Sequence, residues 1–100
     1  MWQMTPEQFI ASLEDPSCPP NISEPLRALW EDAKGHWDRA HEIAQNVDDT
    51  TGAWIHAYLH RKEGDTGNAA YWYRRAGQPI AHGTLESEWE QIVSVLLKQT

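Results

Sequence analysis

The sequence predicts an all-α protein of about six helices. Several stretches carry apolar residues three and four positions apart, and no stretch shows the sustained alternation that is typical of a half-buried strand. Glycine, proline and capping residues separate these stretches into segments of ordinary helix length. The 100 residues, of which 40% are hydrophobic, suffice for one domain with a single core. We therefore expect one α-helical domain over residues 1–100.

The first helix is expected to begin at Thr5, which can cap it. Pro6 suits the first helical position, and Gln8 completes a capping box three residues after the cap. Trp2 is expected to pack beneath this helix. Asp15 should end the helix, because the residue before a proline avoids the helical region.

The second helix is expected to begin after its cap, Ser23, and to end at Gly35, and the third helix follows directly. Apolar residues at helical spacing predict one buried face on each of these helices. These faces comprise Leu26, Leu29, Trp30 and Ala33 in the second helix, and Trp37, Ala40, Ile43, Ala44 and Val47 in the third.

The next two helices are expected to form a hairpin. Residues 48–52 are read as a polar connector that can cap a fourth helix over about 53–63. The fifth helix should cover about 66–76, with Asp65 as its cap and Gly77 as its terminator.

The last helix is expected over about 84–98, beginning at Thr84. It has a clear amphipathic face, which predicts that one side of it is buried. The apolar residues of this face are Leu85, Trp89, Ile92, Val93 and Leu96.

An internal repeat relates the central helices. When Gly35 is aligned with Gly64, the flanking residues fall into register with an offset of 29 residues. The matched pairs include Leu26 with Ile55, Ala28 with Ala57, Leu29 with Tyr58, Trp30 with Leu59, and Ala40 with Ala69. The repeat units cover about 24–48 and 53–79. Because one hairpin cannot bury its apolar face alone, we expect two stacked hairpins with capping helices at both ends.

The second unit resembles tetratricopeptide and Sel1-like repeats. The residues that carry the resemblance are Trp54, Ala57, Tyr58, Gly64, Ala69, Tyr73, Ala76 and Pro79. The first unit departs from the pattern, with His41 and Ala44 where the second has Ala70 and Tyr73, and the period is shorter than usual. The string HAYLHRKEGD also resembles segments of small bacterial proteins. The resemblance implies a fold and, by analogy, peptide or protein binding on a concave face.

Composition narrows the classes of partner and compartment. A net charge of −7 argues against nucleic-acid binding and against binding to anionic membrane surfaces. The one cysteine, Cys18, cannot form an intramolecular disulfide, and a reducing compartment fits it. The first residues show no signal-peptide pattern, and no apolar run is long enough to span a bilayer. We therefore expect a cytoplasmic protein.

His56 and His60 are the candidate metal ligands. Their i, i+4 spacing lets both rings face the same way, but zinc requires at least a third protein ligand. Glu63, His41 and His82 are the candidates for that ligand, and no sequence motif selects among them. The sequence therefore favours two partly exposed histidines over a metal site, and it predicts no cofactor.

Basic residues are concentrated in the second hairpin, where they are Arg61, Lys62, Arg74 and Arg75. The simpler interpretation is a solvated face whose cations pair with nearby acidic residues. The alternative is an anion site, in which His56, Tyr73 and Arg74 hold a carboxylate or a phosphate.

Consecutive aromatic residues on the fifth helix cannot all be buried. Tyr71, Trp72 and Tyr73 point in directions about 100° apart, so at least one should lie outside the core. An exposed aromatic beside an arginine is typical of a binding hot spot. The alternative is that the last helix covers these side chains through Trp89.

The sequence contains no catalytic motif, so we do not predict an enzyme. We expect a non-catalytic module that binds a protein or peptide, or a second copy of itself as a homodimer. The expected binding residues are His56, His60, Tyr71, Trp72, Arg74 and Arg75. The alternative is a domain that binds a small molecule, an anion or a metal through His56 and His60 with a nearby arginine or tyrosine.

Overall fold

The computed structural model describes residues 4–99 and confirms the predicted all-α class. It contains six α-helices and one short 3₁₀ helix, and residues 4–99 include no strand. The helices are α1 (Pro6–Ala11), η1 (Ser12–Glu14), α2 (Glu24–Ala33), α3 (Trp37–Gln45), α4 (Thr50–Lys62), α5 (Thr66–Ala76) and α6 (Leu85–Lys98). Trp2 lies outside the described residues, so its predicted packing is not described. None of the helices within 4–99 is long and apolar enough to cross a membrane.

The predicted helix starts are confirmed except that of α4. The Thr5 hydroxyl accepts the Gln8 backbone N–H, and the Gln8 side chain accepts the Thr5 N–H in return, which completes the capping box. The fourth helix begins at Thr50, three residues earlier than expected. The reason is that the Asp49 carboxylate accepts the Gly52 N–H and so caps the helix inside the predicted connector.

The turns of the two hairpins have the same geometry, 29 residues apart. Gly35 and Gly64 both adopt a φ of 89°, which only glycine adopts without strain. Each glycine donates its N–H to the carbonyl three residues earlier, and the residue after it donates to the carbonyl five residues earlier. These bonds satisfy carbonyl groups at the end of the first helix of each hairpin.

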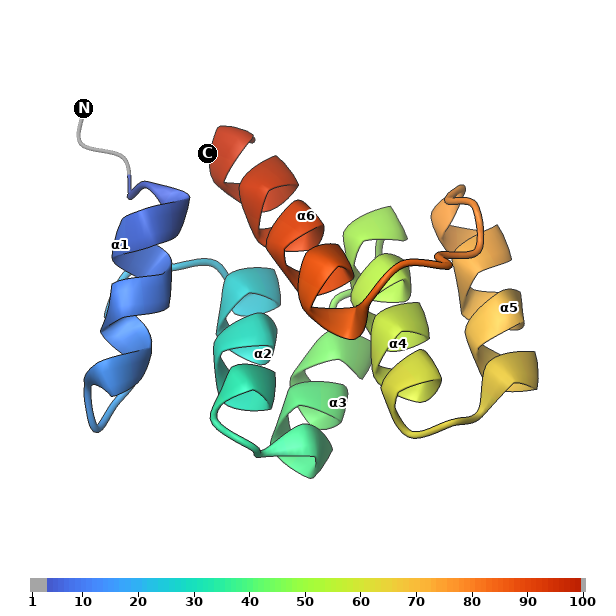
Figure 1. Cartoon of the computed structure of the whole chain (residues 1–100), viewed down its shortest axis with the longest axis horizontal. Coiled ribbons are helices and arrows are strands. Elements are labelled where there is room, and N and C mark those ends of the chain that lie inside the picture. The colour runs from blue at the N-terminus through green and yellow to red at the C-terminus, as the bar shows by residue number, and fades with distance from the viewer. Residues whose placement is uncertain (1–3, 100) are drawn as a thin grey trace.

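The hairpins α2–α3 and α4–α5 pack side by side, with α3 and α2 both against α4. Helix α6 crosses α2 and α4 and also contacts α1 (Figure 1). It therefore covers the first helices of both hairpins instead of extending the row of hairpins. The opposite side of α4, between α3 and α5, is not covered by α6.

One buried carboxylate joins α6 to the second hairpin. Glu88 accepts hydrogen bonds from the Trp54 indole at 3.3 Å and the Tyr73 hydroxyl at 2.6 Å, and it pairs with Arg61 at 2.9 Å. The Trp89 indole donates to the carbonyl of Leu29 on α2 at 3.0 Å. These bonds orient α6 while its apolar face fills the core.

The predicted inner face of α2 was wrong at Ala33, which is exposed. Ala33 borders a surface cavity between α1, α2 and α6, so no helix covers it. Its neighbour Asp32 is buried instead, because the carboxylate accepts the Tyr58 hydroxyl and pairs with Lys62.

Candidate functional site

The two candidate histidines are buried in α4. His56 is 7% exposed and His60 is 8% exposed, so the expectation that they are partly exposed was wrong. Both lie on the side of α4 that faces α3 and α5. The ring of Trp72, from α5, stacks on His56, and the ring of Trp37, from α3, approaches His60 edge-on. Aromatic rings from both flanking helices therefore cover these imidazoles.

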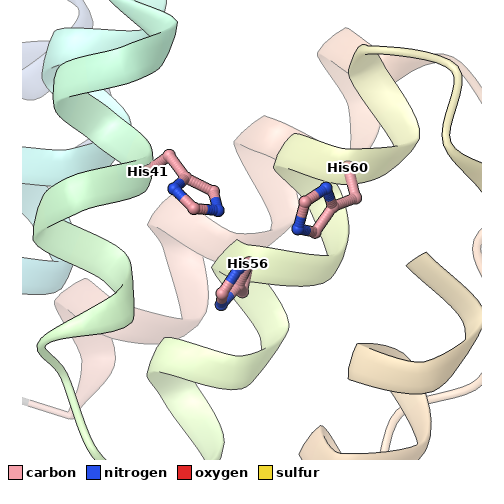
Figure 2. A group of neighbouring side chains, drawn as sticks. All are labelled: His41, His56 and His60. Carbon is pink, nitrogen blue, oxygen red and sulfur yellow. The ribbon is translucent and has the colours of Figure 1, made fainter. Parts of the chain in front are cut away.

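His41 of α3 joins them to form a three-histidine cluster. Figure 2 shows His41 reaching from α3 towards His56 and His60 on α4. Its ring centroid is 4.5 Å from that of His56 and 5.2 Å from that of His60, and the latter two are 4.8 Å apart. One ligand nitrogen from each histidine can be chosen so that all three lie within 4.8 Å of one another.

Two tryptophans hold the imidazole rings in orientation. Trp72 stacks on His56 with centroids 4.0 Å apart and an interplanar angle of 14°. Trp37 stacks on His41 at 5.0 Å and 15°, and its own indole N–H donates to the carbonyl of Leu59 at 2.9 Å. Restricting a ligand's rotation lowers the entropic cost of binding an ion there.

The carboxylate of Glu63 contacts the imidazole ring of His60. The Nδ1 atom of His60 lies 2.6 Å from a carboxylate oxygen of Glu63. When Nδ1–H donates to this carboxylate, the Nε2 atom carries the free lone pair. Metal-binding histidines usually make this type of bond, which fixes the tautomer and strengthens the ligand. Glu63, a candidate third ligand from the sequence, is therefore placed to orient His60.

The surroundings of His41 and His56 favour the neutral form of both imidazoles. Burial, and then the neighbouring His41 and His60, lower the pKa of His56 to about 4. Burial, and then His60, lower the pKa of His41, against smaller opposing effects of Glu63 and Asp38. A metal ion binds the neutral form of histidine, so these ligands need not lose a proton near pH 7.

The ligand nitrogens of the cluster lie within 4.8 Å of one another, a wider limit than the spacing around a tetrahedral ion. Zinc–nitrogen bonds of about 2.0–2.1 Å place two tetrahedral ligands about 3.3 Å apart. Among residues 4–99, the ligand group that holds all three histidines includes no fourth side chain. His82 is exposed in the loop before α6 and lies outside this group. A bound ion would therefore retain a position for water or another ligand.

The consecutive aromatics of α5 lie in three different environments. Tyr71 is 46% exposed, Trp72 is half-buried against His56, and Tyr73 is buried. The last helix covers Tyr73 through Glu88, which binds its hydroxyl. Arg75 donates to the Tyr71 hydroxyl at 3.1 Å, and its guanidinium lies over the rings of Tyr71 and Trp72. The exposed aromatic that the sequence predicted is therefore Tyr71.

The anion site that the sequence suggested around His56, Tyr73 and Arg74 is not assembled. Tyr73 directs its hydroxyl towards Glu88 of α6, whereas His56 faces His41 on α3. The side chain of Arg74 is exposed. His56 and Tyr73 belong to different helices and face different neighbours, so the three side chains do not converge.

The other two basic residues of the hairpin hold buried carboxylates. Arg61 pairs with Glu88 and also donates to the carbonyl of Gly83, and Lys62 pairs with Asp32. The expected partners were acidic residues close to these cations in sequence, whereas the partners found lie on α6 and α2. These cations therefore join helices together.

A surface cavity of about 320 Å³ adjoins the cluster at His56. It lies between the end of α3, the start of α4 and the outer part of α5, where Trp72 and Arg75 form one wall. The binding residues predicted from the sequence thus fall into two groups. His56, His60 and Trp72 belong to the buried cluster, and the remaining members of α5 lie at the surface beside it.

The sequence offers His41 as one of three candidate ligands but carries no pattern that selects it. The 29-residue repeat aligns it with Ala70, so the repeat carries no signal for it. Comparisons with protein-family models, curated proteins and solved structures find no match to this chain.

Proposed function

We propose that this chain binds a divalent transition-metal ion through His41, His56 and His60. The observation that carries this proposal is the convergence of three imidazoles from α3 and α4, with ligand nitrogens within 4.8 Å of one another. Imidazole ligands suit zinc, copper and nickel, and a set of three is a known zinc arrangement. The bond between Glu63 and His60 supports the proposal independently of the spacing.

The position of the ligands indicates what the ion would do for the fold. His41 belongs to the first hairpin, whereas His56 and His60 belong to the second. An ion bound by all three would link the hairpins on the side of α4 that α6 leaves uncovered. We therefore expect metal binding to stabilise the folded chain, because the unfolded chain does not hold the three rings together.

The test uses the full chain without a histidine tag. We expect titration calorimetry to find one zinc, nickel or copper ion per chain. At a free metal concentration of about one hundred times Kd, the folded state should gain about 2.7 kcal/mol. Each kcal/mol corresponds to a rise of about 4–8 °C in Tm for a domain of this size.

Two variants test whether metal binding depends on the three-histidine cluster or on any histidine of the chain. His41→Ala should abolish the metal-dependent rise in Tm, whereas His82→Ala, at an exposed loop residue, should retain it. Wild-type protein that shows neither bound metal nor a change in Tm would reject the proposal. An equal loss in both variants would also reject it, because the binding would then not depend on the cluster.

A second candidate function is docking of a protein partner on the outer face of α5. The specific observation is the exposed Tyr71 ring, which Arg75 contacts by a hydrogen bond and a cation–π interaction. Exposed tyrosine and arginine are the residues that most often dominate binding surfaces. Light scattering over a concentration series tests self-association, and Tyr71→Ala with Arg75→Ala should then dissociate a dimer. A monomer at every concentration would exclude the homodimer.

A further inference from the structure

A larger cavity, of about 470 Å³, lies between α1, α2 and α6. The described residues that line it do not include the three histidines or the exposed face of α5. It is therefore separate from the proposed metal site. Its volume lies within the range of pockets that hold small organic molecules.

One side of this cavity is apolar. Ile10 and Leu13 contribute from α1 and η1, and Leu85 and Trp89 contribute from α6. Ile10 is 41% exposed, one of the few large hydrophobic side chains in residues 4–99 with that much exposure. Its contact with water is unfavourable, and an apolar ligand in the cavity would reduce that contact.

The charged groups of the cavity are predominantly negative. At its base, Asp32 accepts the Tyr58 hydroxyl at 3.0 Å and pairs with Lys62 at 2.9 Å, so these two charges largely offset each other. At its rim, Glu86 and Glu90 are exposed and lie four residues apart on the same helix. Two carboxylates are left in excess, in a chain whose net charge is −7. A cleft lined by charge of one sign concentrates ligands of the opposite sign.

We propose that this cavity binds a small organic cation, an ammonium group on an apolar body. The apolar body contacts Ile10, Leu13 and Trp89, and the ammonium group lies beside Glu86 and Glu90. An anionic ligand of the same size would meet the same apolar wall but would be repelled by the rim.

Two probes that differ in the sign of their charge test this proposal on the full chain. They are 4-phenylbutylamine, which is cationic at pH 7, and 4-phenylbutyrate, which is anionic. Calorimetry at low ionic strength should show at least tenfold tighter binding of the amine. The amine should also shift the NMR methyl signals of Ile10, Leu13 and Leu85. Equal affinities, no binding of the amine, or shifts confined to other parts of the chain would overturn the proposal.

Two double variants with the same change in net charge complete the test. Glu86→Gln with Glu90→Gln should weaken the amine about threefold to tenfold, as expected for two partly solvated charges. Asp38→Asn with Glu42→Gln, at exposed residues of α3, should change the affinity by less than about twofold. Circular dichroism checks that both variants are folded. The same loss of affinity in both would mean that only net charge matters, and the proposed site would be wrong.

Discussion

Gly52 and Gly67 both lie in the first turn of a helix but meet different surroundings. A Cβ atom added to Gly52 would lie 2.9 Å from the carbonyl carbon of Val47 and still closer to its oxygen. A Cβ atom added to Gly67 would meet nothing within 4 Å beyond its chain neighbours and the backbone of its own helix. Glycine at 52 is therefore required by the close approach of the loop between α3 and α4, whereas glycine at 67 is not required by packing.

We predict opposite effects of alanine at these two positions. Gly52→Ala should lower the free energy of unfolding by about 1–3 kcal/mol, because the backbone must move to admit the methyl group. Gly67→Ala should raise it by about 0.4–1 kcal/mol, since alanine has the better helix propensity and restricts the unfolded chain. Urea unfolding of both variants measures the difference. A stabilised Gly52→Ala variant would contradict the packing that the structure describes.

Two buried tyrosines predict a loss of stability at alkaline pH. Burial, followed by the charge of Asp32, raises the pKa of Tyr58, against a smaller effect of Arg61. Burial, followed by its hydrogen bond to Glu88, raises the pKa of Tyr73 in the same direction. In the unfolded chain, tyrosine loses its proton at about pH 10. The two tyrosines should therefore contribute their full share to the free energy of unfolding below pH 10. This contribution should fall as the pH rises above 10.

The measurement is urea unfolding between pH 8 and pH 11. The double variant Tyr58→Phe with Tyr73→Phe should be less stable at pH 8, because Asp32 and Glu88 each lose a hydrogen-bond donor. Its stability should then fall less steeply with pH than that of the wild type. Equal slopes above pH 10 would show that these two hydroxyls do not contribute.

At the scale of the elements, the attachment of α6 depends strongly on one side chain. Glu88 is 4% exposed and contacts Trp54, Arg61 and Tyr73 on the second hairpin. Buried carboxylates are unfavourable unless they are paired and hydrogen-bonded, and Glu88 has both types of partner. Its loss would leave the Tyr73 hydroxyl and the Arg61 guanidinium without this acceptor.

We predict that Glu88→Ala lowers the free energy of unfolding by about 3–5 kcal/mol. The control is Glu90→Ala, two residues along the same helix, which is exposed and should change the stability by less than about 0.5 kcal/mol. Chemical denaturation measures both values. Equal effects would mean that helix α6 as a whole, rather than the buried carboxylate, determines the cost.

At the scale of the molecule, α6 supplies a large part of the core. Its buried apolar side chains are Trp89, Ile92, Val93, Leu96 and Leu97. They cover the first helices of both hairpins. Two hairpins without α6 would expose this apolar face to water.

We therefore predict that a chain ending at Gly83 does not unfold cooperatively. The loss of five core side chains at about 1.5–3 kcal/mol each is comparable to the whole stability of an ordinary domain. The dye ANS should bind the shortened chain, and its thermal transition should broaden or disappear. A chain ending at Lys98 serves as the control. A sharp transition in the shorter chain would show that the two hairpins are sufficient.

Much of the fold could be predicted because its signals are local. The caps at Thr5, Ser23 and Asp65 are confirmed, since each bonds a backbone group only three residues away. The start of α4 was misjudged because either part of the polar segment 48–52 could have capped it. The burial of His56 and His60 was also missed, because the rings that cover them come from α3 and α5.

The sequence by itself determined the helices, all of their starts but that of α4, and the glycine turn shared by Gly35 and Gly64. These features depend on hydrogen bonds and steric limits within a few residues of each position. Only the tertiary structure decided that His41, rather than His82, meets His56 and His60, and that α6 lies across both hairpins. Which side chains meet depends on how helices far apart in the sequence rotate and pack against one another, and no local pattern records that.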